Sequence, residues 1–319
     1  MFNRYLIPIC LTFTSVLIAA PQVDAARETR AILARDVAAI AKKTVVRIEA
    51  SDGGFGSGVI IGRTEKGNKN VYTILTAAHV IRGNNLNYRI ITPLSIGGSG
   101  ERKRSKISIN LKQGIKIFPN VDLAEISFES SDTFAIGTLG NSQYADEGSP
   151  VYVAGFPQPG KAINRIAFQF TGGMISSRLE ESDRDPKKQN NGYDLIYTSI
   201  TRAGMSGGPV LDIAGRIIAI HGQGDRNSPT GQEEGNNALP GDEKTGFNLG
   251  IPIQTFLKLQ PQASTTIGAR LDLSPVNPQV SDNSATIGTR HEKFTKKFRT
   301  RSDAPPLFDV TKVNEKTYE

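Results

Sequence analysis

Apolar positions recur at two different spacings along the chain. Residues 27–43 carry apolar side chains at helical spacing, among them Ile32, Val37 and Ile40, which predicts one short amphipathic helix. From residue 45 onward, short apolar runs alternate with clusters of Gly, Asn and Ser, a pattern typical of strands joined by turns. The first set of expected strands is Val45–Glu49, Gly58–Ile61, Val71–Thr76, Arg89–Thr92, Lys106–Leu111 and Ala124–Phe128. The second set is Pro150–Gly155, Ile166–Ile175, Asp194–Thr198, Gly208–Leu211, Arg216–His221 and Gly246–Gly250.

These two sets predict an all-β fold of two six-stranded antiparallel Greek-key barrels within residues 44–258. A C-terminal helix is expected at Ile251–Leu259, with Pro252 near its first turn. Residues 26–43, which contain the N-terminal helix, are either a propeptide or a helix packed on the barrels. The polar, glycine-rich segment Asp225–Lys244 is expected to be a long loop that borders the cleft.

The two ends of the chain have a different character. Residues 1–25 combine Arg4, an apolar stretch from Tyr5 to Ala20, and small residues ahead of a cleavage site after Ala25, which predicts a signal peptide. Pro8 and the short apolar core argue against a membrane span. We therefore expect an exported protein, periplasmic or extracellular, without a membrane span in the mature chain. Residues 259–319 are polar and proline-rich, which predicts a disordered tail.

Composition narrows the possible chemistry. The chain of 319 residues holds one Cys and three His, and the Cys lies in the predicted leader. We therefore expect no disulfide framework, no thiol chemistry, no metal centre and no cofactor. The formal charge of +7 is mildly basic, but no strong basic stripe is interleaved with aromatic residues, so no nucleic-acid partner is expected. The sequence does not set the oligomeric state.

Three short motifs carry the candidate chemistry. Residues 75–80 read LTAAHV, residues 121–128 read VDLAEISF, and residues 203–210 read AGMSGGPV. Each motif alone is weak, because a His near a strand end or a Ser in a glycine-rich turn is usually structural. Together they place His79, Asp122 and Ser206 in that order, with gaps of 43 and 84 residues. The ordered set is much more specific than any of its members.

These residue types suit nucleophilic catalysis. A Ser hydroxyl becomes a nucleophile when a neutral imidazole, whose ordinary pKa is about 6.5, takes its proton. A buried carboxylate holds that imidazole in the required tautomer. The glycines around Ser206 permit a tight turn, so the N–H groups of Gly204 and Ser206 are expected to form an oxyanion hole.

With these motifs the chain resembles the trypsin/chymotrypsin-like serine peptidases over residues 44–258. TAAHV, DLA and G-x-S-G-G-P all match motifs of that family. The resemblance implies a catalytic triad of His79, Asp122 and Ser206 in a cleft between two barrels, and protein or peptide substrates. It departs from the family at Met205, where digestive members carry Asp and bacterial members usually carry Asn. The loop that forms the oxyanion hole must therefore be held by other contacts.

The pocket residues resemble those of bacterial glutamyl endopeptidases. Ile200 stands where trypsin carries its specificity Asp, so a preference for Lys or Arg is not supported. Thr201 lies five residues before Ser206 and His221 lies fifteen after it, where a Thr and a His of glutamyl endopeptidases bind the substrate carboxylate. By resemblance, His221, Gly222 and Gln223 would also offer backbone hydrogen bonds to an extended substrate. We therefore expect a serine endopeptidase that prefers Glu before the scissile bond.

The sequence also fits two other interpretations in part. The first is a catalytically silent protein that uses the same fold to bind peptides or a partner. The second is an α/β-hydrolase, since residues 204–208 also fit G-x-S-x-G. The order His, Asp, Ser and the absence of alternating strands and helices reject this second reading.

Overall fold

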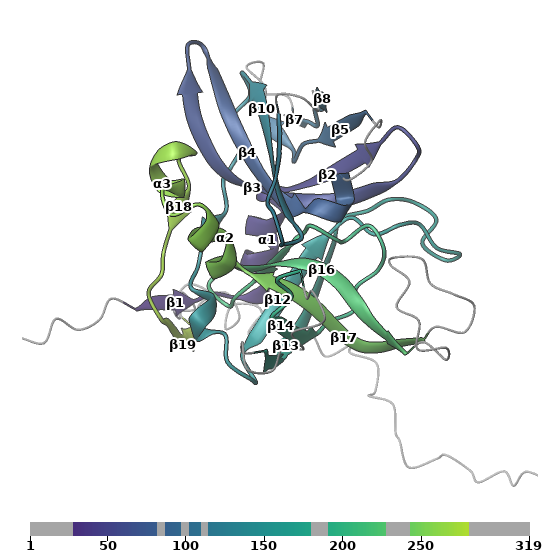
Figure 1. Cartoon of the computed structure of the whole chain (residues 1–319), viewed down its shortest axis with the longest axis vertical. Coiled ribbons are helices and arrows are strands. Elements are labelled where there is room, and N and C mark those ends of the chain that lie inside the picture. Colours follow the sequence, from purple (N-terminus) through teal and green to yellow (C-terminus); the bar gives the residue numbers. More distant parts are fainter. Residues whose placement is uncertain are drawn as a thin grey trace, which may run out of the picture.

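The computed structural model describes residues 28–81, 87–96, 102–109, 114–179, 191–227 and 243–280. It consists mainly of β-strands in two halves that follow one another along the chain, with few helices (Figure 1). The predicted signal peptide, residues 228–242 of the predicted cleft loop and residues 281–319 of the predicted tail lie outside the described residues. None of the described helices is long and apolar enough to cross a membrane.

The first half is a seven-stranded sheet in the order β8-β5-β2-β3-β4-β10-β9. Its strands are β2 (Val45–Ala50), β3 (Phe55–Lys66), β4 (Lys69–Ala77), β5 (Tyr88–Ile91), β8 (Lys106–Ile109), β9 (Ile115–Ile117) and β10 (Leu123–Ser130). A separate hairpin joins β6 (Ser95–Ile96) to β7 (Arg102–Lys103). In β10 the buried Ile126 and Phe128 alternate with the more exposed Ser127 and Glu129, as expected for a strand with one face on the core.

The second half is an eight-stranded sheet in the order β15-β12-β13-β14-β17-β16-β11-β18. Its strands are β11 (Thr138–Leu139), β12 (Pro150–Gly155), β13 (Gln169–Arg178), β14 (Leu195–Thr198), β15 (Pro209–Leu211), β16 (Ile217–Asn227), β17 (Glu243–Pro252) and β18 (Arg270–Leu271). Because β15 also pairs with β16, six of these strands close into a barrel. The expected six-stranded barrel is thus present in this half.

The first half does not form the closed six-stranded barrel that the sequence predicts. It is a curled half-barrel, in which the short strand β9 pairs with Ala124–Ile126 of β10. At the other end of the sheet, β8 pairs only with β5 among the described strands, so the sheet does not close on itself. The expected double barrel is therefore correct in outline and wrong in the closure of its first half.

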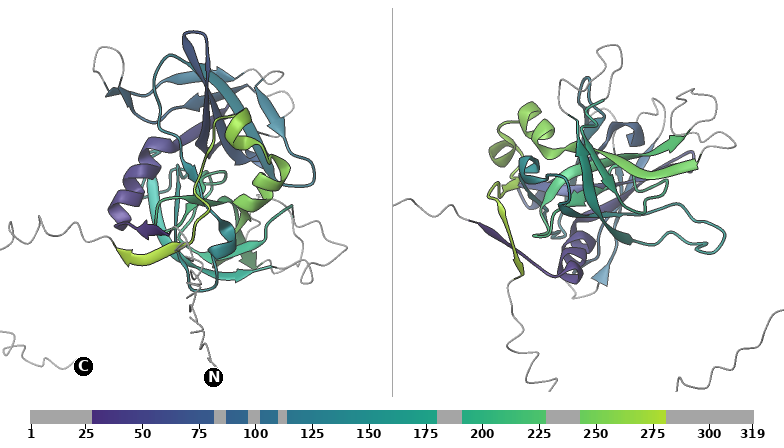
Figure 2. Two further views of the ribbon diagram at one scale, coloured as in Figure 1. Left: turned by 90° about the vertical axis from the view of Figure 1, so that its left-hand side faces the viewer. Right: turned by 90° about the horizontal axis from the view of Figure 1, so that it is seen from below.

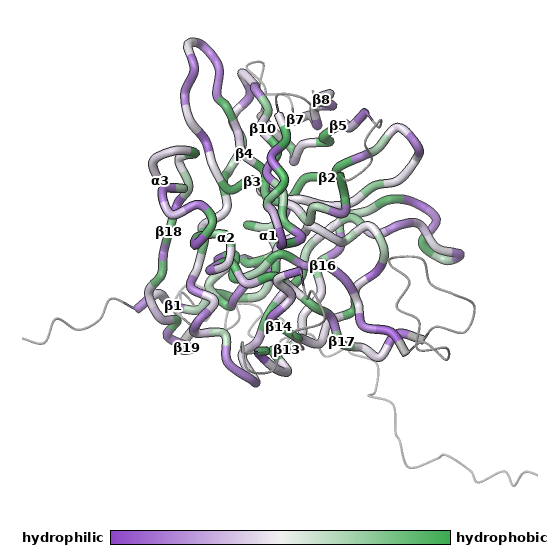
Figure 3. The backbone as a smooth tube through the Cα atoms, in the orientation of Figure 1, coloured by the Kyte–Doolittle hydropathy of each residue, from purple (hydrophilic) through white to green (hydrophobic). Residues whose placement is uncertain are grey.

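A continuous apolar core joins the two halves. It combines Val59 and Leu75 of the first half with Leu211 and Ile220 of the barrel, all fully or almost fully buried. Each half also has its own cluster, around Ile74 in the first half and around Tyr197 in the barrel. In Figure 3 hydrophobic positions gather where the halves meet, whereas the tip of the β3–β4 hairpin is hydrophilic. The two halves are therefore packed as one body.

The N-terminal segment only partly forms the helix expected over residues 27–43. The helix α1 spans Ala34–Thr44, and Thr29–Ala31 forms strand β1 instead. Strand β1 pairs in parallel with β19 (Val276–Val280), and the N–H of Ile32 donates to the Ile213 carbonyl at 2.9 Å. These distant partners override the helical spacing. Val37 of α1 is completely buried in the shared core, so the helix packs on the two halves.

The chain beyond residue 259 is ordered as far as residue 280, contrary to the expected disordered tail. Helix α2 (Ile253–Leu259) is followed by α3 (Ala263–Thr266), β18 and β19. Residues 260–280, here called the C-terminal strap, run along the outside of both halves (Figures 1 and 2). A Cβ on Gly62 of β3 would lie 2.3 Å from the Ile267 carbonyl oxygen, so the strap packs directly on the first half. Backbone pairing rather than a large apolar face holds the strap, which explains why hydropathy did not reveal it.

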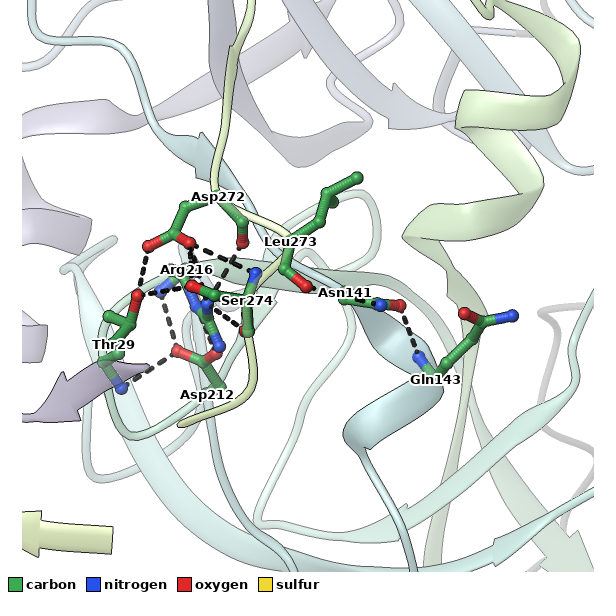
Figure 4. Close-up of polar contacts among 9 residues, drawn as sticks. Thr29, Asn141, Gln143, Asp212, Arg216, Asp272, Leu273 and Ser274 are labelled. Carbon is green, nitrogen blue, oxygen red and sulfur yellow. Dashed lines mark hydrogen bonds and ion pairs between the residues drawn. The ribbon is translucent and has the colours of Figure 1, made fainter. Parts of the chain in front are cut away.

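A buried arginine fastens the strap to the barrel (Figure 4). Arg216 is 3 % exposed, and its guanidinium donates to the Asp212 carboxylate at 2.8 Å and to the carbonyls of Asp272 and Ser274 at 3.1 and 2.7 Å. The Asp272 carboxylate accepts a hydrogen bond from the Thr29 hydroxyl, which leads on to β1. One charged network therefore joins the barrel, the strap and the N-terminal strand. Nearby, η2 (Ser142–Tyr144) is capped by Asn141, whose side chain also donates to the Leu273 carbonyl.

We predict that Arg216→Met lowers the free energy of unfolding by about 3–5 kcal/mol, because it removes the cation that pairs with the buried Asp212 carboxylate and the donor to two carbonyls. Urea denaturation measures the effect, and the exposed Arg35→Met is the matched control, expected to change stability by less than about 0.5 kcal/mol. An Arg216→Met protein as stable as the control would show that the network does not hold the strap.

Candidate active site

His79 is fixed by the residue that it pairs with. Strand β4 ends at Ala77, and a short 3-10 turn, η1 (Ala78–Ile81), presents His79. The N–H of Ala78 donates to the Asp122 carbonyl at 3.0 Å, and the N–H of His79 donates to the Asp122 carboxylate at 2.8 Å. Asp122 stands immediately before β10, which is hydrogen-bonded to β4. The sheet therefore brings the LTAAHV and VDLAEISF motifs together.

The imidazole of His79 lies against the same carboxylate. Its Nδ1 is 2.5 Å from Oδ2 of Asp122, and Asp122 is 3 % exposed. Burial acts to raise the pKa of Asp122, but hydrogen bonds from His79 and Tyr193 outweigh it, so the pKa of the carboxyl lies below its ordinary value. An ionised carboxylate accepts the Nδ1 proton, which leaves Nε2 of His79 as the basic nitrogen.

Tyr193 is a functional contact that the sequence analysis missed. Its hydroxyl donates to Oδ2 of Asp122, and the side chain is buried. A Cβ on Gly222 would lie 2.0 Å from the Tyr193 ring, so the ring reaches Asp122 only because residue 222 has no side chain. Tyr193 just precedes β14 in a stretch without a motif, and only the fold places it beside a residue 71 positions away.

The turn around Ser206 needs two glycines. Gly204 and Gly207 have φ angles of +93° and +84°, in the left-handed region that favours glycine. A Cβ on Gly207 would lie 2.1 Å from Oγ1 of Thr76 and 2.2 Å from the Ser57 carbonyl oxygen. The turn is therefore pressed against the first half of the molecule, and side chains at these two positions are excluded.

Ser57 of β3 holds this turn in the place of a polar residue at position 205. Its hydroxyl donates to the Gly204 carbonyl at 2.8 Å, and its N–H donates to the Ser206 carbonyl at 2.8 Å. Its hydroxyl oxygen also accepts from the N–H of Phe156 at 2.9 Å. Met205 itself is completely buried in the barrel core. These contacts of Ser57 hold the turn, although position 205 carries Met instead of a polar Asp or Asn.

The expected oxyanion donors remain free for a ligand. The N–H of Gly207 donates to the His221 carbonyl and that of Gly208 to the Met205 carbonyl. Among the described residues, by contrast, no backbone hydrogen bond uses the N–H of Gly204 or of Ser206. Two such donors in one turn, one of them on Ser206 itself, suit the stabilisation of a developing oxyanion.

A cavity of about 600 Å³ contains the chemistry-bearing residues from both halves. His79 and Ser206 line it together with Gly204, Thr201, His221 and Gln223. Gly222 is not among the lining residues, and its contact with Tyr193 sets it apart from the expected substrate-binding backbone. Most of the residues expected at the site are therefore brought to one cavity that crosses the boundary between the halves. No group of His, Cys, Asp or Glu in the described part of the chain is arranged to hold a metal ion.

The two expected carboxylate-binding residues lie in the cavity but do not act as a charged pair. The Thr201 hydroxyl donates to the side-chain oxygen of Asn248, whose amide in turn donates to the Ser199 carbonyl at 2.8 Å. His221 is 2 % exposed, and burial, Lys244 and His79 lower its pKa to about 3. Its imidazole is therefore neutral at physiological pH, so it supplies no positive charge.

The protonation of His221 follows from its partner. Its Nδ1 is 2.6 Å from the hydroxyl of Tyr197, and burial raises the pKa of that hydroxyl well above its ordinary value. A protonated Tyr197 hydroxyl donates to Nδ1, which leaves the proton of the neutral imidazole on Nε2. His221 is thus a neutral hydrogen-bond donor in the wall of the cavity.

Comparisons with known proteins identify a family and a similar fold. Residues 56–220, more than half of the chain, match the sequence model described as the trypsin-like peptidase domain, and this range contains His79, Asp122 and Ser206. No curated protein matches the chain. Among solved structures, Deg5 is 19 % identical with a TM-score of 0.51, over 73 % of this chain and 94 % of Deg5. The HtrA-type protease AlgW with a tripeptide is 20 % identical with a TM-score of 0.49, over 74 % of this chain and 65 % of AlgW. The likeness to Deg5 supports the fold.

We predict that Tyr193→Phe raises the pKa of the Asp122 carboxyl, because the ionised form loses one of its hydrogen-bond donors. NMR titration of the Asp122 carboxyl carbon measures the change. Tyr144→Phe, which alters an exposed tyrosine, is the matched control and should leave Asp122 unchanged. If Tyr193→Phe lowered stability without moving the Asp122 titration, the tyrosine would serve packing alone.

Proposed function

The chain belongs to the trypsin-like serine peptidase family, and we propose that it is an endopeptidase in which His79, Asp122 and Ser206 form the catalytic triad. The observation that carries this proposal is the placement of His79 and Ser206 in one cavity, with His79 held on a buried, ionised Asp122. Among the described residues that line the cavity, no other pair offers a comparable nucleophile and base.

The proposed mechanism follows from the donors and acceptors of the site. Nε2 of His79 takes the Ser206 hydroxyl proton as the oxygen attacks the substrate carbonyl. The negative charge that develops on the carbonyl oxygen is met by the free N–H groups of Gly204 and Ser206. His79 then returns the proton to the leaving amine, and water hydrolyses the acyl-enzyme by the reverse use of the same groups.

We further propose that the enzyme prefers Glu before the scissile bond. Support comes from the described residues that line the cavity, which include the cations Arg202, Arg226 and Lys244 and, as a single carboxylate residue, Asp52. Nε2–H of His221 adds a neutral donor that suits a carboxylate oxygen. The exposed Ile200, at the position of the trypsin specificity Asp, offers no partner for a basic side chain.

The alternative function is a silent peptide-binding protein on the same fold. A silent binding protein would not need an ionised Asp122 paired with His79, or N–H groups without a backbone acceptor in the turn around Ser206. Both features are present among the described residues. Labelling of folded protein by a fluorophosphonate separates the two functions, because only an activated Ser206 reacts.

We predict that chromogenic peptides with Glu, Asp, Arg, Phe or Ala before the scissile bond are hydrolysed fastest when that residue is Glu. Ser206→Ala or His79→Ala should remove hydrolysis of every peptide, by about a thousandfold or more, whereas His221→Ala should lose the Glu peptide selectively. Equal or faster cleavage after Arg or Phe would contradict the Glu preference. A wild-type protein that neither cleaves nor takes a fluorophosphonate at Ser206 would contradict the endopeptidase function.

We also propose that the protein is exported to the periplasm or the cell exterior. The proposal rests on the leader pattern of residues 1–25 and on the position of the only Cys within it, which leaves a mature chain without thiols. N-terminal sequencing of the exported protein should begin at Ala26. A cellular protein that retains Met1 and stays in the cytoplasm would contradict export.

A further inference from the structure

We infer that Lys244 is a specificity-determining residue, whose ammonium group binds the carboxylate of the substrate side chain before the scissile bond. The inference rests on the proposed peptidase function and deepens it, because it names the charge that selects an acidic substrate. Lys244 was not a candidate in the sequence, where it appeared as the last residue of a polar loop. In the structure it belongs to β17 and pairs with Arg226 across the end of the β-ribbon.

The ammonium of Lys244 lies beside Thr201 and Gly224, two residues that line the cavity. Nζ donates to the Thr201 carbonyl at 2.7 Å, and Thr201 lies on the segment that leads into Ser206. On the opposite wall, a Cβ on Gly224 would lie 3.2 Å from Nζ, so the glycine leaves room for the ammonium beside β16. Thr201, Gly224 and Lys244 all line the cavity that contains Ser206. The Lys244 side chain is thus tethered within the substrate site, although its stem is solvent-exposed.

The charge of Lys244 has no carboxylate partner among the described residues. Its backbone acceptor satisfies one of three N–H donors and carries no formal charge. Partial burial and the neighbouring Arg226 and Arg202 lower the pKa of Lys244. The ammonium group therefore lies close to other positive charges. Asp225, the acidic residue next to Arg226, accepts from the hydroxyl of Thr245 instead. A substrate carboxylate would therefore be the missing counter-ion.

The two residues expected to bind the carboxylate cannot supply that charge. The Thr201 hydroxyl proton is used by Asn248, and His221 is neutral. His221 still offers Nε2–H, so it orients a carboxylate, whereas a charge-assisted hydrogen bond from Lys244 is about twice as strong as one from a neutral donor. Among the described contacts of Arg202, Arg226 and Lys244, Lys244 alone has its charged end fixed by a hydrogen bond to a residue that lines the cavity.

A pair of peptides that differ only in Glu or Gln before the scissile bond isolates this charge. The wild type should favour Glu in kcat/KM, and Lys244→Met should lower the Glu/Gln ratio by ~10-fold or more while the Gln peptide changes little. Lys244→Arg should keep most of the preference, and Lys244→Glu should turn it towards a Lys peptide. Lys43→Met, an exposed lysine on α1, is the matched control. Fluorophosphonate labelling of Ser206 reports that each variant is folded.

The outcomes separate this inference from the proposed function. A Glu/Gln ratio that survives Lys244→Met, in a protein that still labels at Ser206, overturns the role of Lys244 and leaves the Glu preference standing. A wild type that cleaves peptides without favouring Glu overturns both the preference and the role of Lys244, but not the peptidase.

The pH dependence gives an independent readout. The titratable groups around the bound carboxylate are Lys244, Arg202, Arg226, Asp52, His79 and His221. Because His221 has a pKa of about 3, it stays neutral between about pH 6 and pH 8, and any effect of His79 on catalysis is shared by both peptides. The Glu/Gln ratio should therefore stay flat over this range. The ratio should fall only at alkaline pH, where Lys244 loses its proton. Because the pKa of Lys244 is lowered, this fall should begin at a lower pH than it would for an ordinary lysine. A ratio that falls between pH 6 and pH 8 would assign the charge to a histidine instead.

Discussion

The contact between the two halves is the constraint on which the rest of the structure depends. His79 and Asp122 come from the curled half-barrel, and Ser206 comes from the closed barrel, so no half contains the site alone. The apolar cluster that joins the halves is fully packed and includes Val59, Leu75 and Ile220. Because close-packed interiors resist sliding, this cluster fixes the separation of His79 and Ser206. Helix α1 and the C-terminal strap add contacts on the outside of the same joint.

Polar contacts cross this joint in both directions and set the chemistry. Ser57 reaches from the half-barrel to hold the carbonyls of Gly204 and Ser206, while Tyr193 reaches from the barrel to Asp122. Each crossing is possible because a glycine yields space, at Gly207 beside Ser57 and at Gly222 beside Tyr193. The turn around Ser206 and the carboxylate that pairs with His79 are therefore each contacted by a residue of the opposite half. A shift between the halves would loosen both at once, which couples the geometry of the site to the packing of the core.

The sequence predicted most of the strands and the grouping of the motifs, because alternating burial and glycine turns are local signals. Pro150–Gly155 was predicted with the bounds of β12, and His79 and Ser206 line one cavity, with Asp122 hydrogen-bonded to His79. The predictions that were wrong concern features that depend on strands distant in the sequence. Strand β1 pairs with the distant strand β19, and the edge of β10 pairs with β9 instead of closing the sheet with β8. Tyr193 and Lys244 carry no motif, so only the fold could bring them to the site.

The direction of hydrogen bonds decides what the pocket can recognise. Thr201 and His221 have the residue types that a carboxylate site needs, and a sequence gives no reason to doubt them. The structure assigns the Thr201 proton to Asn248 and keeps His221 neutral, because a charged imidazole without an anionic partner would be costly at 2 % exposure. A neutral donor fixes the orientation of a carboxylate but discriminates weakly between Glu and Gln, whose oxygens both accept. Selection by charge therefore requires a cation that can remain ionised near solvent, and a partly exposed lysine meets that condition where a buried histidine cannot.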